Sequence, residues 1–416
     1  MTDTTQRISP AAHLAPGKWE LVAMMAMLMA LNALAIDIML PGLQQIGASM
    51  GVEDENSRQF IVTAYVFGFG VAQIAYGPIS DRFGRKKPLL VGLAIYFIGA
   101  VLCVFSPSFG MLLAVRFFQG LGAAATRVIS VSVVRDLHGG RAMAEIMSLI
   151  MMVFMIVPII APSLGQVIMI FGEWHLIFFF LGAAALINIV WISLRLPETQ
   201  HPEDVTPLTP KAVGHSFYLV LSNRTALFYT LATTFIMGCI FGFVTSAQQV
   251  FVEVFGLGTL FPLAFAGVGV VMATSSLLNS RIVGKLGMRR LSHAAMIGFA
   301  VTNGIWLVLD LIFGGTMPFA LFYIIFLAAW FQFGWIGANF NSLAMEPLGH
   351  VAGAASSILG FASTAGSALL GSFIGLSYNG TTTPMITGFF IFAVIALVMT
   401  LIAEKGKLFQ PHNQPV

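Results

Sequence analysis

The chain has 416 residues, of which 58% are hydrophobic and only 9% are charged. Soluble domains carry about 25% charged residues, so this composition excludes a soluble globular protein and indicates a polytopic membrane protein. The formal net charge is only +3, and the basic residues lie in loops rather than in one patch, so nothing points to nucleic-acid binding. The two cysteines, Cys103 and Cys239, fall in apolar stretches and suggest neither a disulfide framework nor a metal site.

The apolar stretches predict twelve membrane spans, because each span needs about 20 residues. Six lie in the first half of the chain, near residues 19–41, 59–77, 88–105, 109–134, 143–168 and 175–195. A polar stretch with four prolines follows at 197–223. Six more are predicted near 225–246, 260–281, 291–312, 318–342, 353–377 and 384–403. We therefore expect an all-α membrane protein with two six-helix bundles, 19–196 and 224–403, a linker at 197–223, and tails at 1–18 and 404–416.

The basic residues predict the orientation of these spans. With the N-terminus inside, 17 of the 20 lysines and arginines fall in cytoplasmic segments or at their membrane edges. The exceptions are Arg58, Arg116 and Arg127. This distribution follows the positive-inside rule. The even number of spans then predicts that both termini are cytoplasmic.

Span 1 contains an acid, Asp37, in the sequence LNALAIDIMLPGL about one turn before Pro41. A carboxylate inside the membrane is costly unless it faces a cavity or a partner. Burial and a nearby cation shift a carboxyl pKa in opposite directions, so a site that alternates between them can load and release a proton. The alternative is an interfacial aspartate that caps the outer end of the span.

The loop after span 2 reads GPISDRFGRKK over residues 77–87. Its glycines, Gly77 and Gly84, permit a tight chain reversal, and Asp81 can cap or pair at a helix end. Its basic residues favour the cytoplasmic side of the membrane; they are Arg82, Arg85, Lys86 and Lys87. The alternative is an ordinary basic loop between two spans.

Span 4 carries Arg116 about two turns inside its outer end, at a depth similar to that of Asp37 in an antiparallel helix. A buried arginine needs a counter-charge, so we expect the two to pair, and Gln119 shares the face of Arg116. The alternative is a purely structural ion pair. Arg127 follows Arg116 by eleven residues, close to three turns, and either lines an inner cavity or extends to the cytoplasmic interface.

Spans 5 and 10 carry the remaining candidate site residues. Pro158 and Pro162 bend span 5, and Gly165 adds flexibility; a generic kinked span is the alternative. In span 10, the spacing of Gln332, Trp335 and Asn339 gives one polar and aromatic face. Such a face suits a largely apolar ligand with a few hydrogen bonds, and helix packing with an aromatic belt is the alternative.

The two halves resemble a duplicated unit. SDRFGRKK (80–87) has a degraded echo in VGKLGMRR (283–290), and DLHGGRAMA (136–144) resembles EPLGHVAGA (346–354). Parallel repeats of this kind suit a rocking transporter with a midplane site. The second echo matches Asp136 with Glu346, and we expect both to brace cytoplasmic helix ends and gate the inner face. Solvated loop positions are the alternative.

The loop motif is similar to that of the major facilitator superfamily. Together with AIDIMLP, RFFQGLGAA, APSLG and AMEPLGHVAGAASS, it resembles the Bcr/CflA drug-resistance transporters among the twelve-span drug:proton antiporters. The end of span 5 is similar to the antiporter motif Gly-Pro-x-x-Gly-Gly, with Ala161 and Gln166 replacing two glycines. Arg127 departs from the small or apolar residue expected there, which allows acidic or unusual substrates.

This resemblance implies a transporter of the bacterial inner membrane that exports drug-like compounds, such as bicyclomycin or phenicols, in exchange for protons. It assigns the embedded acid to Asp37, the span 4 arginine to Arg116 and the gating-loop acid to Asp81. No P-loop is present, so we expect a proton gradient instead of a bound cofactor. We expect no enzymatic activity, no nucleic-acid partner and a monomer. The alternatives are a metabolite transporter of the same fold and a non-transporting membrane scaffold or sensor.

Overall fold

The computed structural model describes residues 16–410 except 53, 139, 202–213 and 215–217. In that part of the chain twelve helices are long and apolar enough to cross a membrane. The predicted tail 1–18, linker 197–223 and tail 404–416 therefore lie partly outside the described residues. The chain divides into two compact units, residues 1–53 with 64–213, and residues 54–63 with 214–416, and each unit is described by itself.

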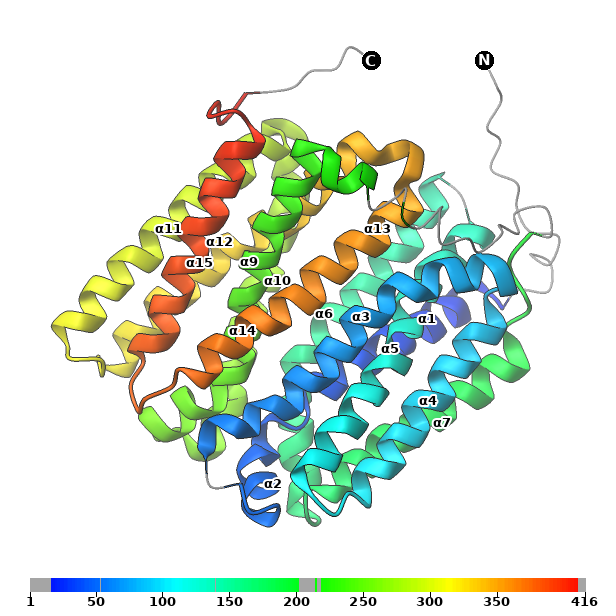
Figure 1. Ribbon diagram of the computed structural model, residues 1–416, viewed down its shortest axis with the longest axis horizontal. Coiled ribbons are helices and arrows are strands. Elements are labelled where there is room, and N and C mark those ends of the chain that lie inside the picture. Colours follow the sequence, from blue (N-terminus) through cyan, green and yellow to red (C-terminus); the bar gives the residue numbers. More distant parts are fainter. Residues whose placement is uncertain (1–15, 53, 139, 202–213, 215–217, 411–416) are drawn as a thin grey trace. The chain divides into compact units, whose positions relative to one another are not determined.

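The first unit contains six of the candidate spans (Figure 1). Its helices are α1 (Lys18–Asp37), α2 (Leu43–Ser49), most of α3 (Phe60–Phe83), α4 (Lys86–Val104), α5 (Phe109–Leu137), α6 (Gly140–Ile170) and α7 (His175–Arg195). A short 3-10 turn, η2 (Leu40–Gly42), joins α1 to α2 and contains Pro41. Helix α1 packs against α5, α6 and α7, and α4 packs against α5 and α7.

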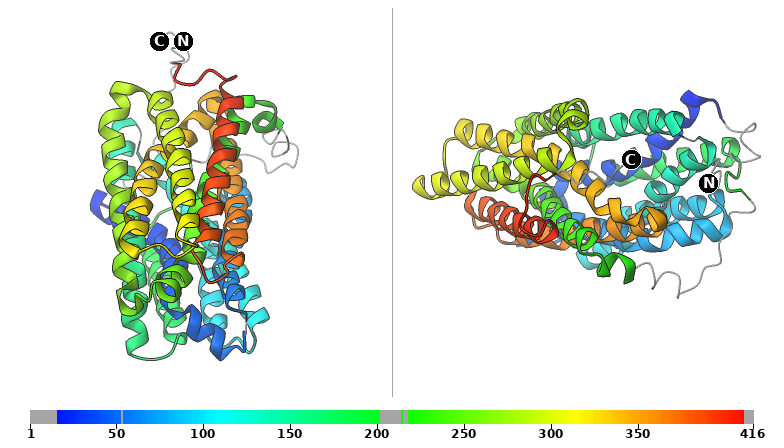
Figure 2. Two further views of the ribbon diagram at one scale, coloured as in Figure 1. Left: turned by 90° about the vertical axis from the view of Figure 1, so that its left-hand side faces the viewer. Right: turned by 90° about the horizontal axis from the view of Figure 1, so that it is seen from above.

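The second unit begins with the short turn η3 (Glu55–Gln59) and contains the other six spans. They are built from α9 (Arg224–Gln248) with η5 (Gln249–Val254), η6 (Gly258–Leu260) with α10 (Phe261–Leu286), α11 (Met288–Ile312), α12 (Phe319–Met345) with η7 (Glu346–Val351), α13 (Ala352–Phe361) with η8 (Ala362–Gly366) and α14 (Ser367–Leu376), and α15 (Thr383–Ala403). Helix α9 packs against α12, α14 and α15, as the end-on view of Figure 2 shows for α15.

Three local features differ from the predicted spans. Helix α3 continues to Phe83 and α4 begins at Lys86, so the predicted loop 77–87 shortens to two residues and Gly77 lies inside a helix. The chain reversal depends on Gly84 alone, whose φ of +87° is a conformation that only glycine adopts readily. In span 1, α1 ends at Asp37 because Pro41 cannot continue the hydrogen-bond ladder, and α2 carries the span to Ser49.

Small residues allow close helix contacts around the end of α1. A Cβ on Gly165 of α6 would overlap the carbonyl oxygen of Ile38, and one on Gly120 of α5 would overlap the carbonyl oxygen of Tyr65. Helices approach this closely only where no side chain intervenes. The glycine of span 5, predicted to supply flexibility, thus also lets α6 pack directly beside Asp37.

Candidate functional site

Asp37 is a buried carboxylate at the end of α1. The residue is 5% exposed, and within the described part of the chain its side chain makes no hydrogen bond or ion pair. The C-terminal end of a helix carries a partial negative charge, which disfavours a second negative charge there. Burial of an ionised carboxylate without a partner is costly. The surroundings of Asp37 therefore favour a carboxyl group that carries a proton.

Arg116 is fully buried in α5, at 0% exposure. Its guanidinium donates hydrogen bonds to Gln119 Oε1 at 2.6 Å and to the carbonyl oxygen of Ala35 at 2.8 Å, and contacts Met39 Sδ at 3.6 Å. The rings of Tyr65 and Phe178 lie 4.3 and 5.7 Å from its Cζ atom, within the range of cation–π attraction. The predicted partnership with Gln119 is confirmed.

The predicted ion pair between Asp37 and Arg116 is not present in the structure, although both residues are described. Arg116 instead contacts the chain on either side of Asp37, at the carbonyl oxygen of Ala35 in α1 and at Met39 after the end of α1. The sequence predicted a similar depth in the membrane for the two charges. It did not show whether the two side chains would point toward each other. Their roles in proton coupling stay predictions.

The other two candidate site residues in the middle of α5, Gln119 and Arg127, differ in their surroundings. Gln119 Nε2 is buried and has no acceptor among the described residues. Arg127 is exposed, and its guanidinium lies 6.0 Å from the ring of Phe69. In the described part of the chain no carboxylate pairs with Arg127. Its predicted place in the substrate cavity stays a prediction.

The prolines of span 5 lie inside α6, as predicted, and α6 continues through Pro158 and Pro162. The structure adds that Gly165 packs against the chain directly after Asp37. A change in the bend of α6 would therefore move the backbone beside Asp37. The antiporter role of the three residues stays a prediction.

The three candidate residues of span 10 bond to neighbouring helices, and their predicted place in the substrate cavity stays a prediction. Gln332 donates to Thr302 Oγ1 of α11 at 2.9 Å, and Trp335 Nε1 donates to the carbonyl oxygen of Ser275 of α10 at 3.1 Å. Asn339 Nδ2 donates to Asn279 Oδ1 of α10 at 2.8 Å. These groups join α12 to two different neighbours instead of forming one face for a ligand. The helix-packing alternative describes them, because a buried polar group must find a hydrogen-bond partner.

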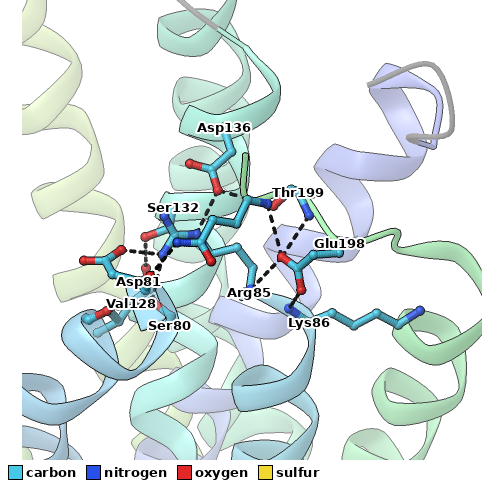
Figure 3. A network of polar contacts seen from close by, with 11 residues as sticks. Ser80, Asp81, Arg85, Lys86, Val128, Ser132, Asp136, Glu198 and Thr199 are labelled. Carbon is cyan, nitrogen blue, oxygen red and sulfur yellow. Dashed lines mark hydrogen bonds and ion pairs between the residues drawn. The ribbon is translucent and has the colours of Figure 1, made fainter. Parts of the chain in front are cut away.

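The short turn between α3 and α4 is the centre of a polar network (Figure 3). Arg85 donates to Asp81 Oδ1 at 2.5 Å, to Asp136 Oδ2 at 2.8 Å and to Ser80 Oγ at 3.0 Å. Burial of the guanidinium would lower the pKa of Arg85, but the bonds and charges of Asp136 and Asp81 raise it above its usual value. The predicted bracing by Asp136 is therefore present, whereas Arg82 is exposed and makes no bond among the described residues.

Glu198, which is not among the residues predicted from the sequence, completes this network. Its carboxylate accepts hydrogen bonds from the backbone N–H groups of Arg85 at 2.7 Å and Lys86 at 3.2 Å. These N–H groups are at the start of α4, where the helix dipole attracts negative charge. A Cβ on Gly84 would collide with the Glu198 carboxylate. The only sequence signal was an acid directly after span 6, in LPET.

The second unit repeats this arrangement. Gly287, with φ of +83°, turns the chain before α11. Arg289 then donates to Glu346 Oε2 and to Glu404 Oε1, both at 2.8 Å. Glu404 also accepts from the Tyr229 hydroxyl at 2.7 Å, and that hydroxyl lies 2.8 Å from His293 Nε2. In each unit, an arginine that follows a left-handed glycine pairs with an acid at the end of the fourth span. An acid after the sixth span belongs to the same network. Arg289, Glu404 and His293 were not predicted.

Arg85→Ala is expected to destabilise the folded protein by about 3 kcal/mol, because it leaves two carboxylates without their shared cation. Arg82→Ala is the matched control, since Arg82 is exposed and should contribute less than about 1 kcal/mol. Unfolding titrations of both variants in detergent measure the difference. Equal stability of the two variants would contradict the bracing role of Arg85.

Glu404 predicts a pH dependence of stability. Burial raises the pKa of its carboxyl group, but the hydrogen bonds from Tyr229 and Arg289 and the charges of Arg289 and His293 lower it below its usual value. A lowered folded-state pKa stabilises the protein above the unfolded value of about 4.3, and this contribution is lost as the pH falls through the folded-state pKa. We expect Glu404→Gln to flatten the decline in melting temperature below about pH 5. Glu173→Gln, at an exposed position, should leave the decline unchanged.

Comparisons with known proteins agree with this architecture. A family model described as Major Facilitator Superfamily matches residues 22–371. A bicyclomycin resistance protein homolog of Haemophilus influenzae is 30% identical over 84% of this chain and 87% of its own length. The multidrug resistance protein MdtL of Escherichia coli O45:K1 is 28% identical over 91% of this chain and 94% of its own. The solved structure of the xylose transporter XylE from E. coli superposes with a TM-score of 0.71 at 14% identity, covering 96% of this chain and 99% of that one.

Proposed function

The chain belongs to the major facilitator superfamily, and from this premise we propose that it exports drug-like small molecules in exchange for protons by alternating access. Two relatives that span most of its length are a bicyclomycin resistance protein homolog and a multidrug resistance protein. Their names support a drug-like substrate. The observation that carries the proton coupling is the buried Asp37, whose carboxylate has no partner among the described residues.

In this mechanism Asp37 carries the proton. A proton that enters from outside neutralises the carboxyl group and removes the cost of a buried charge. Substrate that enters from inside favours release of the proton. Arg116 does not bind Asp37 directly and instead positions the end of α1 through Ala35 and Met39. Gly165 transmits a bend in α6 to the same segment.

The networks around Arg85 and Arg289 are proposed to hold the helix ends of each unit together while the units rock. The cationic loops support a cytoplasmic position for the helix ends that carry Arg85 and Arg289, and for both termini. The protein would then work as a monomer in the bacterial inner membrane, with a small-molecule substrate and protons as its partners and the proton gradient as its energy source.

An organic anion is the second candidate substrate class. Arg127 is an exposed cation on α5 without a carboxylate partner among the described residues. Such a group attracts acidic compounds. An acidic metabolite or an acidic drug would then be preferred over neutral phenicols.

The test is growth of a bacterium without its own drug exporters on a compound panel that contains bicyclomycin, phenicols and organic acids. Drug export predicts resistance to at least one compound with the wild-type protein, and loss of that resistance when a protonophore removes the gradient. Resistance that persists without a gradient would contradict proton coupling. Transport of organic acids alone, abolished by Arg127→Gln, would favour the second candidate.

A further inference from the structure

A basic pocket of about 310 Å³ lies where three membrane spans of the second unit end. Arg224 begins α9, Arg289 is in the first turn of α11, and Ala403 ends α15. The volume is at the lower end of the range for small-ligand sites, about 300 to 1,000 Å³. The pocket is lined by Arg224, Thr225, Arg289, Ala403, Glu404, Lys405, Lys407 and Gln410.

The charge of this pocket is not neutralised within the described residues. Arg289 pairs with both Glu404 and Glu346 at 2.8 Å, so its charge is already neutralised, and Glu404 is the carboxylate of the lining. Arg224, Lys405 and Lys407 are exposed and have no carboxylate partner in the described part of the chain. Three cations of the lining therefore have no carboxylate partner among the described residues, and together they outnumber the carboxylate of Glu404.

The start of α9 adds hydrogen-bond donors to these charges. Asn223 caps only the N–H of Ala226, so the N–H groups of Arg224 and Thr225 are not used by the helix. The positive end of a 25-residue helix points to the same place. Backbone N–H groups, a hydroxyl and cations together form the donor set that phosphate oxygens prefer.

The segment after α15, which carries Lys405 and Lys407, is held in place without a ligand. The N–H of Phe409 donates to His293 Nδ1 at 3.1 Å, and the N–H of Lys407 donates to the Glu404 carbonyl oxygen at 3.0 Å. The Phe409 and His293 rings pack edge to face at 5.9 Å. A preorganised wall reduces the entropy lost when a ligand binds.

We propose that this pocket binds the phosphate group of an anionic lipid headgroup. A soluble phosphate compound offers the same chemistry, but the pocket lies where two membrane-spanning helices of the second unit begin and a third ends, and the ends of membrane spans lie close to lipid headgroups. Basic pockets between the ends of membrane spans are suited to such headgroups. Bound lipid would connect the start of α9 to the C-terminal segment and stabilise the second unit.

The test compares two triple variants of the full-length protein in detergent. The pocket variant is Arg224→Gln/Lys405→Gln/Lys407→Gln, and the matched control is Arg281→Gln/Lys285→Gln/Arg290→Gln, which removes three exposed cations of the same unit that do not line the pocket. Retention of phosphatidylglycerol, with phosphatidylcholine as the neutral lipid, is measured by native mass spectrometry. Competition by inorganic phosphate is measured in parallel, as is the protection of the wild type from thermal unfolding by inorganic phosphate and by phosphatidylglycerol.

We expect the pocket variant to lose at least about tenfold in phosphatidylglycerol retention, and the control less than about threefold. Equal loss in both variants would show a general surface-charge effect and overturn the site. Equal retention of the two lipids by the wild type would overturn it as well. If inorganic phosphate protects the wild type from unfolding and phosphatidylglycerol does not, the pocket binds phosphate, but the proposal that a lipid headgroup supplies it is wrong. None of these outcomes depends on the transported substrate.

Discussion

Asp37→Asn is expected to abolish proton-driven transport while the protein still folds. The amide has nearly the shape of the carboxyl group but cannot carry a proton, and Asp37 makes no bond in the described structure that the amide would break. Coupling between two binding sites commonly changes the affinity at one of them by a factor of about 5 to 150. Gradient-driven transport in proteoliposomes should therefore fall by a factor within this range or by a larger one. Substrate exchange without a gradient should continue.

Asp310→Asn provides the control for the loss of a buried carboxylate. Asp310 is fully buried and accepts hydrogen bonds from the hydroxyls of Thr382 at 2.5 Å and Thr383 at 2.6 Å. It connects α11 to α15, so its loss should lower stability and leave coupling intact in the protein that folds. An Asp37→Asn variant that still couples transport to the proton gradient would refute the proposed role.

Arg116→Ala is expected to destabilise the first unit more than any other substitution discussed above, by about 3 to 5 kcal/mol, the usual cost of truncating a large buried side chain to alanine. The change leaves the oxygens of Gln119 and Ala35 without their donor and removes the cation between the Tyr65 and Phe178 rings. It also leaves a cavity in a fully buried position. The yield of folded protein and its unfolding titration in detergent measure the effect.

Arg135→Ala is the matched control in the same helix, because Arg135 is exposed, and its loss should cost less than about 0.5 kcal/mol. Arg116→Lys distinguishes charge from geometry. A lysine keeps the charge but lacks the planar fork that contacts Gln119 and Ala35 together. If Arg116→Lys is as stable as the wild type, charge alone accounts for the role of Arg116, and the hydrogen-bond geometry does not matter.

The positions of the twelve membrane spans along the chain were predicted well, because hydropathy is a local property of the sequence. At the two-residue turn around Gly84, the local sequence predicted one glycine correctly and the other incorrectly. A glycine next to a run of cations predicted a chain reversal, and the left-handed φ of Gly84 agrees with it. Gly77 was assigned to the same reversal but lies inside α3, because a glycine within a helix and one in a turn are alike in the sequence.

Partners across helices were predicted less well. Span 10 offered three polar residues at helical spacing, and this spacing is the same whether they face a ligand or neighbouring helices. The structure directs Gln332 to α11 and Trp335 and Asn339 to α10. Glu198 was not singled out for a related reason, since it lies 113 residues from the backbone N–H of Arg85 that it binds.

The sequence by itself determined the membrane-spanning class, the twelve apolar segments, the echo between the halves and the candidate charged residues Asp37, Arg85 and Arg116. Only the tertiary structure decided that Arg116 meets α1 at Ala35 instead of Asp37, and that an acid after the sixth span of each unit joins its arginine network. Apolar length is enough to specify a helix in a membrane. Which side chains meet depends on how each helix is rotated about its axis, and this is set by packing among residues far apart in the chain.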